Sequence, residues 1–597
     1  MAALLNERDL AFLLYEFLDT EALLARERYA EQSREVFDAT LETARKIAEE
    51  RFAPHVAKAD ANEPSFDGTS VTLIPETKLA WDAFAAAGFL NAHWDGDEGG
   101  PQLPTVVHSA AVTWFNAANV ATTTYSWLTV GAANLLRTFG TPALKARYLA
   151  PMGDGRFAGT MALTEPAQGS ALGDIKTVAE PQADGTYRVR GQKMFISGGD
   201  QNLTANIVHM VLARIKGAPA GVKGISLFLV PKVLVDANGS LGARNDVALA
   251  GLLHKMGWRN ATSTVLSFGE KGGAVGYLLG EPGMGLAHMF QMMNEARINI
   301  GLCAAAIAYR GYLLSLDYAR ERAQGRLPSC KDPSTPQVRL IEHADVRRLL
   351  LVQKAVAEGA LAMSLYGASL AEDQHTHPEH AARDSTALLL DILTPVIKSW
   401  PSKYGCVAND HAIQVLGGSG YTREYLAEQL YRDQRLNPIH EGAEAIHALD
   451  LLGRKAVMHN GAAYRVFRAA VDATLAEAAR TPGTQALATE FTTPLARLDA
   501  VTAQLAALLA TDPDRALANA GVYLDAFGRI VAAWIWLKQA LAAEQGLASR
   551  PADADFYRGK LQAARYFVTW ELPATLPQFD LLAEVNSVPL EMQDGWF

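Results

Sequence analysis

The chain has 597 residues, of which 49% are hydrophobic, and its 54 Lys and Arg against 64 Asp and Glu leave a net charge of −10. This composition excludes a disordered chain, and the acidic balance argues against nucleic acid or an anionic membrane as a partner held by bulk charge. Three dispersed cysteines form neither a disulfide framework nor a CxxC metal site, so we expect a cytoplasmic protein. The length predicts three or four domains.

The beginning of the sequence does not have the pattern of a signal peptide. Glu7, Arg8 and Asp9 fall where such a peptide would need an apolar core. Elsewhere charges such as Arg310 interrupt the apolar runs, so we expect no membrane span.

Four domains are predicted in chain order. Apolar residues at helical spacing predict an N-terminal α-helical domain over 1–156. Short segments rich in β-branched and aromatic residues then predict a small β-barrel or β-sandwich over 157–281. Helical spacing returns over 282–458, as in a four-helix bundle, and continues over 459–597 as an Ala- and Leu-rich helical extension. The predicted fold is therefore an α+β multidomain chain with the order α, β, α, α.

Two segments of the β region carry candidate ligand-binding residues. MALTEPAQGS (161–170) and GQKMFISGG (191–199) place hydroxyl residues and glycines at strand ends. Thr164, Ser197 and the aromatic Phe195 would suit a flat ring with polar edges, which must be stacked on and hydrogen-bonded. Ordinary strand-to-turn transitions explain the same residues equally well, because Gly and Ser are typical of turns.

Arginines of the predicted bundle allow two interpretations each. Arg297 opens an otherwise apolar helix and is either a paired surface arginine or a buried functional one. Arg320, Arg322 and Arg326, near the end of that helix, form either a solvated face or a phosphate clamp.

A glycine-rich helix end and a lone glutamate follow. The segment 411–421 ends a helix in glycines, either as an ordinary helix stop or where backbone amides approach a ligand. Glu441, before Gly442 at the mouth of the next helix, is either a solvated helix-start residue or a pocket carboxylate whose pKa is raised by burial.

Two motif-like segments are interpreted as structural. Pro378 interrupts the histidine cluster between His375 and His380, so we expect an exposed loop and no metal site. The glycines of 153–158 follow a predicted helix and not a strand, which disfavours a dinucleotide-binding fingerprint.

Taken together and in this order, these segments resemble the acyl-CoA dehydrogenase family of flavoproteins over about residues 80–460. The likeness is to the large bacterial subgroup with a C-terminal helical extension, which acts on fatty acyl-CoA or 3-methylmercaptopropionyl-CoA. The extension would cover the surface through which smaller relatives pair dimers into tetramers. We therefore expect a homodimer.

The resemblance implies FAD as the cofactor. The residues that would contact it in the β domain are Leu163, Thr164, Gly169, Ser170, Phe195 and Ser197. Those that would reach the FAD of a neighbouring subunit are Arg322, Gln324, Gln414, Gly417 and Gly418. The family usually has Trp in place of Phe195 and Thr in place of Ser197, so the ring and the hydroxyl are kept.

The same resemblance assigns the catalytic residues. Glu441 would be the base that takes the substrate's α-proton, and Arg297 would lie at the base of the acyl pocket. The motif around the base usually reads Tyr-Glu-Gly-Thr, and Ala443 here removes a hydroxyl that usually contacts FAD. Some relatives place the base just ahead of the arginine, where this chain has Ala296, so Glu441 is the predicted base.

The implied reaction is oxidation of an acyl-CoA thioester to trans-2-enoyl-CoA, with medium- to long-chain fatty acyl groups as the default. An electron-transfer flavoprotein would take the electrons. The alternatives are a 3-methylmercaptopropionyl-CoA dehydrogenase, an acyl-CoA oxidase, and a DNA-binding alkylation-response flavoprotein. The net charge of −10 argues against the last.

Overall fold

The computed structural model describes residues 3–597, with the side chains of 290–294 left aside. The chain divides into two compact units. The first unit comprises Met1–Arg34, Pro104–Thr113 and Arg297–Phe597, and the second comprises Glu35–Leu103 and Trp114–Ala296.

The helical part of the second unit is built around a cluster of aromatic side chains. Its main helices are α2 (Arg34–Ile47), α4 (Pro75–Ala86), α5 (Thr105–Phe139) and α6 (Pro142–Gly153). Phe84 and Phe115 meet edge to face with ring centroids 4.8 Å apart, and Phe52 and Phe89 lie 5.0 and 5.2 Å from Phe115. Helices α4 and α5 therefore pack together through these rings.

Local sequence sets two boundaries in this region. Helix α6 begins at Pro142, where a missing N–H costs nothing, and the Thr141 side chain caps it by accepting from the Leu144 N–H at 3.3 Å. A short hairpin, β1 (Ser65–Phe66) and β2 (Val71–Thr72), interrupts a region that the sequence predicted to be entirely helical.

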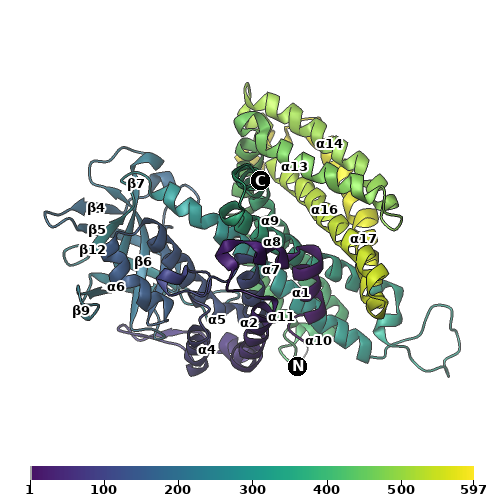
Figure 1. Cartoon of the computed structure of the whole chain (residues 1–597), viewed down its shortest axis with the longest axis horizontal. Coiled ribbons are helices and arrows are strands. Elements are labelled where there is room, and N and C mark those ends of the chain that lie inside the picture. Colours follow the sequence, from purple (N-terminus) through teal and green to yellow (C-terminus); the bar gives the residue numbers. More distant parts are fainter. Residues whose placement is uncertain (1–2) are drawn as a thin grey trace. The chain divides into compact units, whose positions relative to one another are not determined.

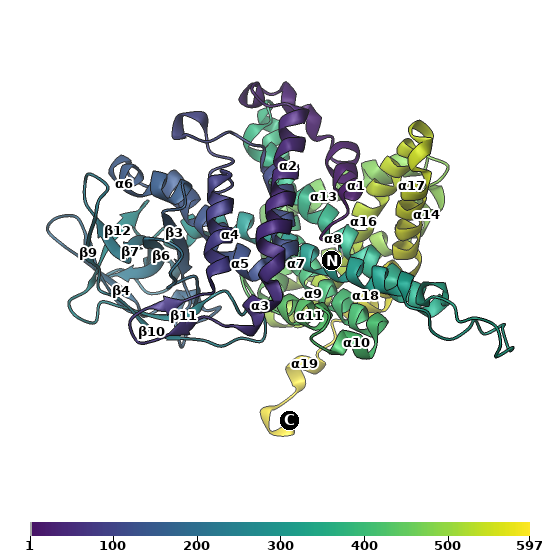
Figure 2. The same cartoon turned by 90° about the horizontal axis from the view of Figure 1, so that it is seen from below.

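The β part of the second unit contains an eight-stranded sheet (Figure 2) and a separate two-stranded sheet of β8 (Val233–Val235) and β9 (Leu241–Arg244). The strands of the larger sheet are β3 (Phe157–Ala162), β4 (Val178–Pro181), β5 (Tyr187–Ser197), β6 (Asn206–Ile215), β7 (Ile225–Pro231), β10 (Val247–Leu252), β11 (Ser263–Phe268) and β12 (Ala274–Leu279). The order along the main path is β10-β11-β5-β12-β7-β6-β3. Pairing along this path is antiparallel except between β3 and β6. Strands β3 and β7 are buried along their whole length, which explains their nearly continuous apolar sequence.

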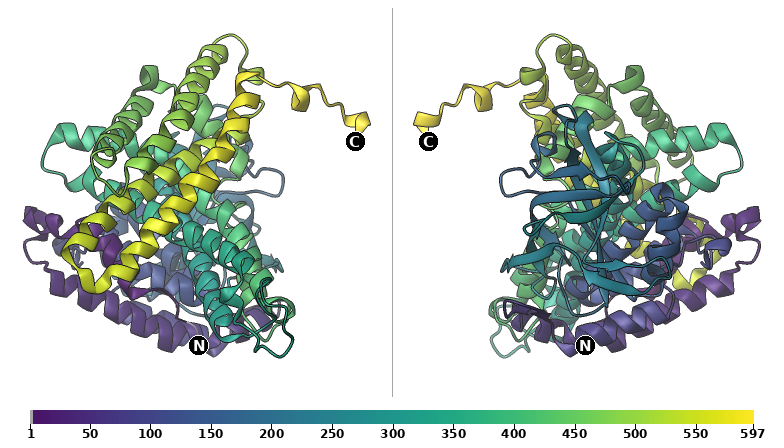
Figure 3. Two further views of the ribbon diagram at one scale, coloured as in Figure 1. Left: turned by 90° about the vertical axis from the view of Figure 1, so that its right-hand side faces the viewer. Right: turned by 90° about the vertical axis from the view of Figure 1, so that its left-hand side faces the viewer.

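Long helices form the first unit (Figure 1). The bundle contains α7 (Gly285–Glu321), α8 (Ala344–Thr376), α9 (His380–Leu416), α11 (Ala427–Gln434) and α12 (Glu444–Asp450). The extension contains α13 (Met458–Ala478), α14 (Gln485–Leu509), α16 (Ala520–Ser549), α17 (Ala554–Tyr566) and α18 (Thr575–Ala583). Helix α16 packs against α13, α14, α17 and α18, and Figure 3 shows these helices side by side.

The predicted fold class is confirmed: helices, an all-β region, a helical bundle and a further helical extension follow one another along the chain. Two details were wrong. Arg297 does not open its helix, because α7 begins at Gly285, and α8 continues to Thr376, so His375 lies on a helix and not in a loop.

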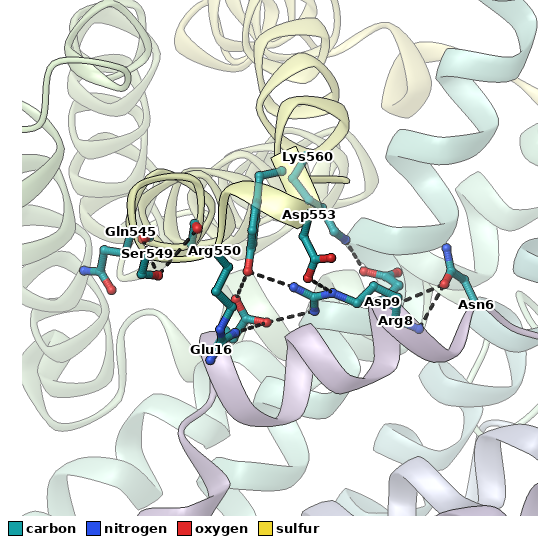
Figure 4. A network of polar contacts seen from close by, with 11 residues as sticks. Asn6, Arg8, Asp9, Glu16, Gln545, Ser549, Arg550, Asp553 and Lys560 are labelled. Atoms are coloured by element: carbon teal, nitrogen blue, oxygen red, sulfur yellow. Dashed lines mark hydrogen bonds and ion pairs between the residues drawn. The ribbon is translucent and has the colours of Figure 1, made fainter. Parts of the chain in front are cut away.

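The first 34 residues lie in the same unit as the C-terminal extension (Figure 4). Asn6 caps α1 (Glu7–Phe12) by accepting from the Arg8 and Asp9 N–H groups. Arg8 then pairs with Asp553 at 3.0 Å, and the buried Asp9 pairs with the equally buried Lys560 of α17. We call these contacts, which join α1 to Asp553 and Lys560 at the start of and within α17, the terminal clasp.

Three helices are long and apolar enough to cross a membrane by length and composition alone, namely Glu295–Glu321 within α7, α8 and α16. In each, 83% of the apolar window is buried within the fold. Burial against other helices therefore accounts for their apolar character. The sequence argument, which relied on charges that interrupt the apolar runs, did not identify these three stretches as long enough to span a membrane.

Candidate functional site

The predicted site residues fall into one set in each unit. The second unit contains Leu163, Thr164, Gly169, Ser170, Phe195 and Ser197. The first unit contains Arg297, Arg322, Gln324, Gln414, Gly417, Gly418 and Glu441.

In the second unit, the structure brings the two predicted segments of the β region together. The Met194 N–H donates to the Thr164 carbonyl at 2.9 Å, and the Lys193 ammonium donates to the Leu163 carbonyl at 2.8 Å. The ends of β3 and β5 are thus joined directly, although the two segments are far apart in sequence. Leu163, Thr164 and Ser197 lie half-buried at this edge.

A buried ion pair that sequence reasoning missed holds this edge. Glu165 and Lys193 lie 3.0 Å apart with side chains 5% and 0% exposed. Burial lowers the pKa of Lys193 to about 8. Burial opposes ionisation of Glu165 too, but Lys193 and the Thr177 hydroxyl hold the pKa of Glu165 below its ordinary value. The only signal in the sequence is a charged residue beside an apolar strand end in each segment.

Phe195 projects from this edge in an uncommon backbone conformation. Its φ is 60°, in the region that favours glycine, and its side chain is 63% exposed, whereas the next residue, Ile196, is 2% exposed in the core. The backbone therefore turns an aromatic ring outward beside the Ser197 hydroxyl. Gly169 and Ser170 lie exposed in the turn after β3, and a Cβ on Gly169 would meet no atom within 4 Å.

In the first unit, Arg297 is a buried residue and not a surface one. It is 3% exposed, and its Nη1 lies 3.4 Å from Asp450 Oδ2. Burial lowers the pKa of Arg297, while the charges of Asp450 and Glu441 oppose this shift. Its Nε has no hydrogen-bond partner among the described residues. The structure thus rules out a surface position for Arg297, and its functional role stays a prediction.

Asp450 belongs to a network that a proline in α9 helps to create. Pro395 has no N–H, so the Asp391 carbonyl four residues earlier lacks its usual helical donor. Lys455, 1% exposed, donates to that carbonyl at 2.7 Å and to the Asp391 carboxylate at 2.6 Å, and lies 3.9 Å from Asp450. The counter-ion of Arg297 is therefore itself held in place.

Glu441 lies in a strained turn just before α12. Its φ is 51° and that of Gly442 is 94°, and a Cβ on Gly442 would lie 2.8 Å from His447 Nε2. The Glu441 carbonyl accepts from His447 Nε2 at 3.2 Å, and the Gly442 carbonyl accepts from Lys398 Nζ at 2.7 Å. Both carbonyls of the turn are thus hydrogen-bonded by buried side chains. Ala443 begins α12 without a side-chain cap, as expected from the loss of a hydroxyl there.

The electrostatics of this turn favour a proton acceptor. Glu441 keeps some exposed surface, but burial of its carboxyl group raises the pKa of Glu441, and the charges of Lys398 and Arg297 partly counter that rise. Burial lowers the pKa of His440 to about 3 and that of His447 to about 2, so both imidazoles are neutral at pH 7. The charges that act on Glu441 are therefore those of Lys398 and Arg297, while the imidazoles of His440 and His447 stay uncharged.

The remaining predicted residues lie exposed in the first unit and are not part of the buried cluster. Gly417, with φ of 60°, ends α9, and its N–H donates to the Ile413 carbonyl at 2.9 Å. Gln414, Gly418, Arg322 and Gln324 are also exposed. The Gln324 N–H pairs with the Val338 carbonyl at 2.9 Å at the base of the loop that follows α7. Their role toward FAD stays a prediction. Among the residues that the structure describes, no group of three His, Cys, Asp or Glu is placed to hold a metal ion.

Known protein families match almost the whole chain. Residues 35–156, 160–270 and 283–457 match the N-terminal, middle and C-terminal domains of acyl-CoA dehydrogenases. Residues 467–593 match a domain described as acetyl-CoA dehydrogenase C-terminal like.

Individual relatives agree with these domains. The chain is 35% identical to 3-methylmercaptopropionyl-CoA dehydrogenase of Ruegeria pomeroyi, covering 94% of each protein. It is 32% identical to the broad-specificity linear acyl-CoA dehydrogenase FadE5 of Mycobacterium tuberculosis, covering 99% of each. The fold is similar to that of an acyl-CoA dehydrogenase complexed with FAD from Bacillus anthracis, with a TM-score of 0.71 at 20% identity over 95% of this chain and 90% of that one. The chain therefore belongs to the acyl-CoA dehydrogenase family of FAD flavoproteins and is an oxidoreductase of that type.

Proposed function

We propose that this enzyme oxidises medium- to long-chain fatty acyl-CoA to trans-2-enoyl-CoA, with Glu441 as the base. The observation that carries the proposal is the Glu441 turn, where a carboxyl group with a raised pKa lies near the cations Arg297 and Lys398. The α-proton of a thioester is weakly acidic, so its removal at neutral pH needs a positioned base whose pKa lies closer to the working pH.

The same turn supplies a candidate for stabilising the charge that develops on the thioester oxygen. The backbone N–H of Glu441 is the donor we assign to that oxygen, because it belongs to the residue that removes the proton. The fixed φ of Glu441 and the hydrogen bonds on both carbonyls of the turn orient this N–H in advance.

FAD, when bound, supplies the acceptor for the hydride that leaves the β-carbon. The residues that would hold its ring are Leu163, Thr164, Phe195 and Ser197, with Gly169 and Ser170 beside its phosphates. The chemistry at this edge of the sheet fits such a ring, since the exposed face of Phe195 offers stacking and the hydroxyl and backbone groups offer hydrogen bonds.

The electron acceptor we propose is an electron-transfer flavoprotein. Reoxidation of the reduced enzyme by O₂, compared with reoxidation by an electron-transfer flavoprotein, distinguishes this from an acyl-CoA oxidase. Fast reoxidation by O₂ alone would favour the oxidase.

The alternative substrate is 3-methylmercaptopropionyl-CoA, which the relative from Ruegeria pomeroyi is named for. Two butyryl-CoA dehydrogenases of Syntrophomonas wolfei are 32% and 31% identical to this chain. Short-chain acyl-CoAs should therefore be tested as substrates too.

The assembly we propose is a cytoplasmic homodimer. It is supported by the helical extension over residues 459–597, which smaller relatives lack. Light scattering coupled to size-exclusion chromatography should give a mass near two chains. A mass near four chains would contradict the homodimer.

Anaerobic titration of the FAD-loaded enzyme tests the reaction. Acyl-CoAs of increasing length, butyryl-CoA and 3-methylmercaptopropionyl-CoA are added in separate experiments, and the visible band of the oxidised flavin is followed. We expect bleaching to be fastest with medium to long chains. Failure of every thioester to bleach the flavin would overturn the proposed reaction, and bleaching restricted to the sulfur-containing thioester would replace the substrate.

A further inference from the structure

A buried lysine beside the Glu441 turn has no role in the reaction described so far. Lys398 lies on α9 between Pro395 and Pro401, and it has 0% exposed surface. Its ammonium group donates to the Gly442 carbonyl at 2.7 Å. We propose that Lys398 is a positioning residue, which fixes the Glu441–Gly442 turn and, by its positive charge, keeps the Glu441 carboxyl group ionised and able to accept a proton. This inference rests on the proposed role of Glu441.

The geometric part of the argument is the strain of the turn. Two successive residues, Glu441 and Gly442, have positive φ values of 51° and 94°. A non-glycine residue persists in this conformation only where its surroundings hold it, because the backbone is strained there. Lys398 reaches the turn from a different helix, 44 residues earlier in the chain, and holds the second of its carbonyls. The position of the Glu441 carboxyl group therefore depends on that contact.

The electrostatic part concerns what surrounds Lys398. The charged groups that act on it are Glu441 of the turn, Arg297 of α7 and Glu444 of α12. Its charge in turn acts on the neutral rings of His440 and His447. Among the charged groups, Glu441 has the largest effect on Lys398, so the two residues act as a pair.

The cost of burying the Lys398 ammonium group indicates that its pairing with Glu441 favours the charged form of Lys398. An ammonium group with no exposed surface is unfavourable unless it is hydrogen-bonded and close to a negative charge. Burial lowers the pKa of Lys398 to about 7, and the negative charge of Glu441 opposes that shift. Lys398 therefore carries its charge on the acid side of neutral pH, and the negative charge of Glu441 favours that charged form.

The direction of the effect on Glu441 follows. Burial raises the pKa of Glu441, while the cations Lys398 and Arg297 lower it. Without the charge of Lys398, burial is opposed by Arg297 alone, so the pKa of Glu441 rises further. At a pH below that value Glu441 is protonated and cannot take the α-proton.

The test is the pH dependence of flavin reduction in Lys398→Met. The rate is measured anaerobically with saturating acyl-CoA, and the acid limb of the profile is compared with that of the unaltered enzyme. We expect this limb to move to higher pH by about one unit, the usual effect of removing a nearby opposite charge. Lys398→Arg retains the charge and should keep the limb in place, even if altered geometry slows the reaction.

Lys403→Met is the matched control. Lys403 lies on the same helix, but it is partly exposed and pairs with Glu444 and Asp525, and Asp525 keeps Arg529 as a partner. This variant should leave the acid limb unmoved. A uniform loss of rate in Lys398→Met with an unmoved limb would mean that Lys398 is merely structural, and would overturn the inference.

Other outcomes also decide the question. If Lys398→Met does not fold, Lys398→Gln keeps a donor for the Gly442 carbonyl without the charge and must show the same displaced limb. If neither neutral variant folds with FAD, Lys398→Arg decides, because a displaced acid limb in a variant that keeps the charge contradicts the proposal. The unaltered enzyme is measured alongside the variants as the reference. If its flavin is not bleached by any acyl-CoA, the proposed function itself is overturned, whereas a result confined to the Lys398 variants bears only on the role of Lys398.

Discussion

The residues assigned to the flavin ring in the second unit differ in exposure from those around the assigned base in the first unit. In the second unit, the aromatic ring of Phe195 is 63% exposed at a strand end, while the charged pair behind it is buried. In the first unit, the charged side chains of Arg297 and Lys398 are themselves buried and surround a strained turn. Exposed rings and hydroxyls suit the binding of a ligand, because binding depends on contact area. Buried charges suit the control of a proton, because electrostatic interactions are stronger where solvation is poor.

Of the replacements that test this difference between the units, replacement of the base should give the largest effect, and it acts on the rate of flavin reduction. Glu441→Gln keeps the size of the side chain and removes its ability to take a proton, so we expect flavin reduction by acyl-CoA to slow about 10³-fold. Bound FAD, measured by its visible spectrum, should remain, because the residues assigned to the ring lie in the other unit.

Glu444→Gln is the control for the base. Glu444 follows three residues later and pairs with Lys403, so its replacement should change the rate little. Normal turnover in Glu441→Gln would contradict the assignment of the base.

Breaking the buried pair of the second unit should give the next largest effect. Lys193→Met leaves Glu165 without its cation in a site that is 5% exposed, so we expect a loss of about 3 kcal/mol in the free energy of unfolding. The pair also holds the Leu163 and Thr177 segments, so FAD content should fall with it.

The control is Lys216→Met, in which an exposed lysine loses its pairing with Glu180. We expect a change below about 0.5 kcal/mol, because exposed pairs contribute little. Urea unfolding followed by circular dichroism measures both variants. Equal stability of the two would show that the Glu165–Lys193 pair does not hold this edge of the sheet.

Removing the exposed ring should give the smallest effect. Phe195→Ala should weaken FAD binding about tenfold, the scale of an aromatic stacking contact, and leave the free energy of unfolding nearly unchanged. Phe195→Trp, which restores the residue usual in the family, should keep the affinity. Fluorescence titration of the apoprotein with FAD measures both, and equal affinity of Phe195→Ala and the unaltered chain would rule out stacking on this ring.

The sequence predicted the order of domains well because helical and strand spacing persist over long segments. It missed the β1–β2 hairpin, whose strands have two residues each, and it placed Arg297 at the opening of its helix, although α7 begins at Gly285. Strands this short carry no periodicity that separates a strand from a turn.

For the site, the resemblance supplied Glu441 and Arg297, and the structure showed that Arg297 is buried. Lys398 and the pair Glu165–Lys193 could not be found from sequence, because a single lysine in an apolar helix or strand is read equally well as a surface residue. Burial of a charge is decided by elements far away in the chain, and spacing along one element does not report it.

The terminal clasp has a consequence for folding during synthesis on the ribosome. Arg8 of α1 and Asp553 are joined by a hydrogen bond across 545 residues, so the terminal clasp cannot form until nearly all of this sequence has been translated. At about 5–20 residues per second the opening helix waits roughly half a minute to two minutes. Throughout that interval Asp9 lacks its ion-pair partner Lys560, and the second unit, whose residues all precede Arg297, can mature ahead of the first.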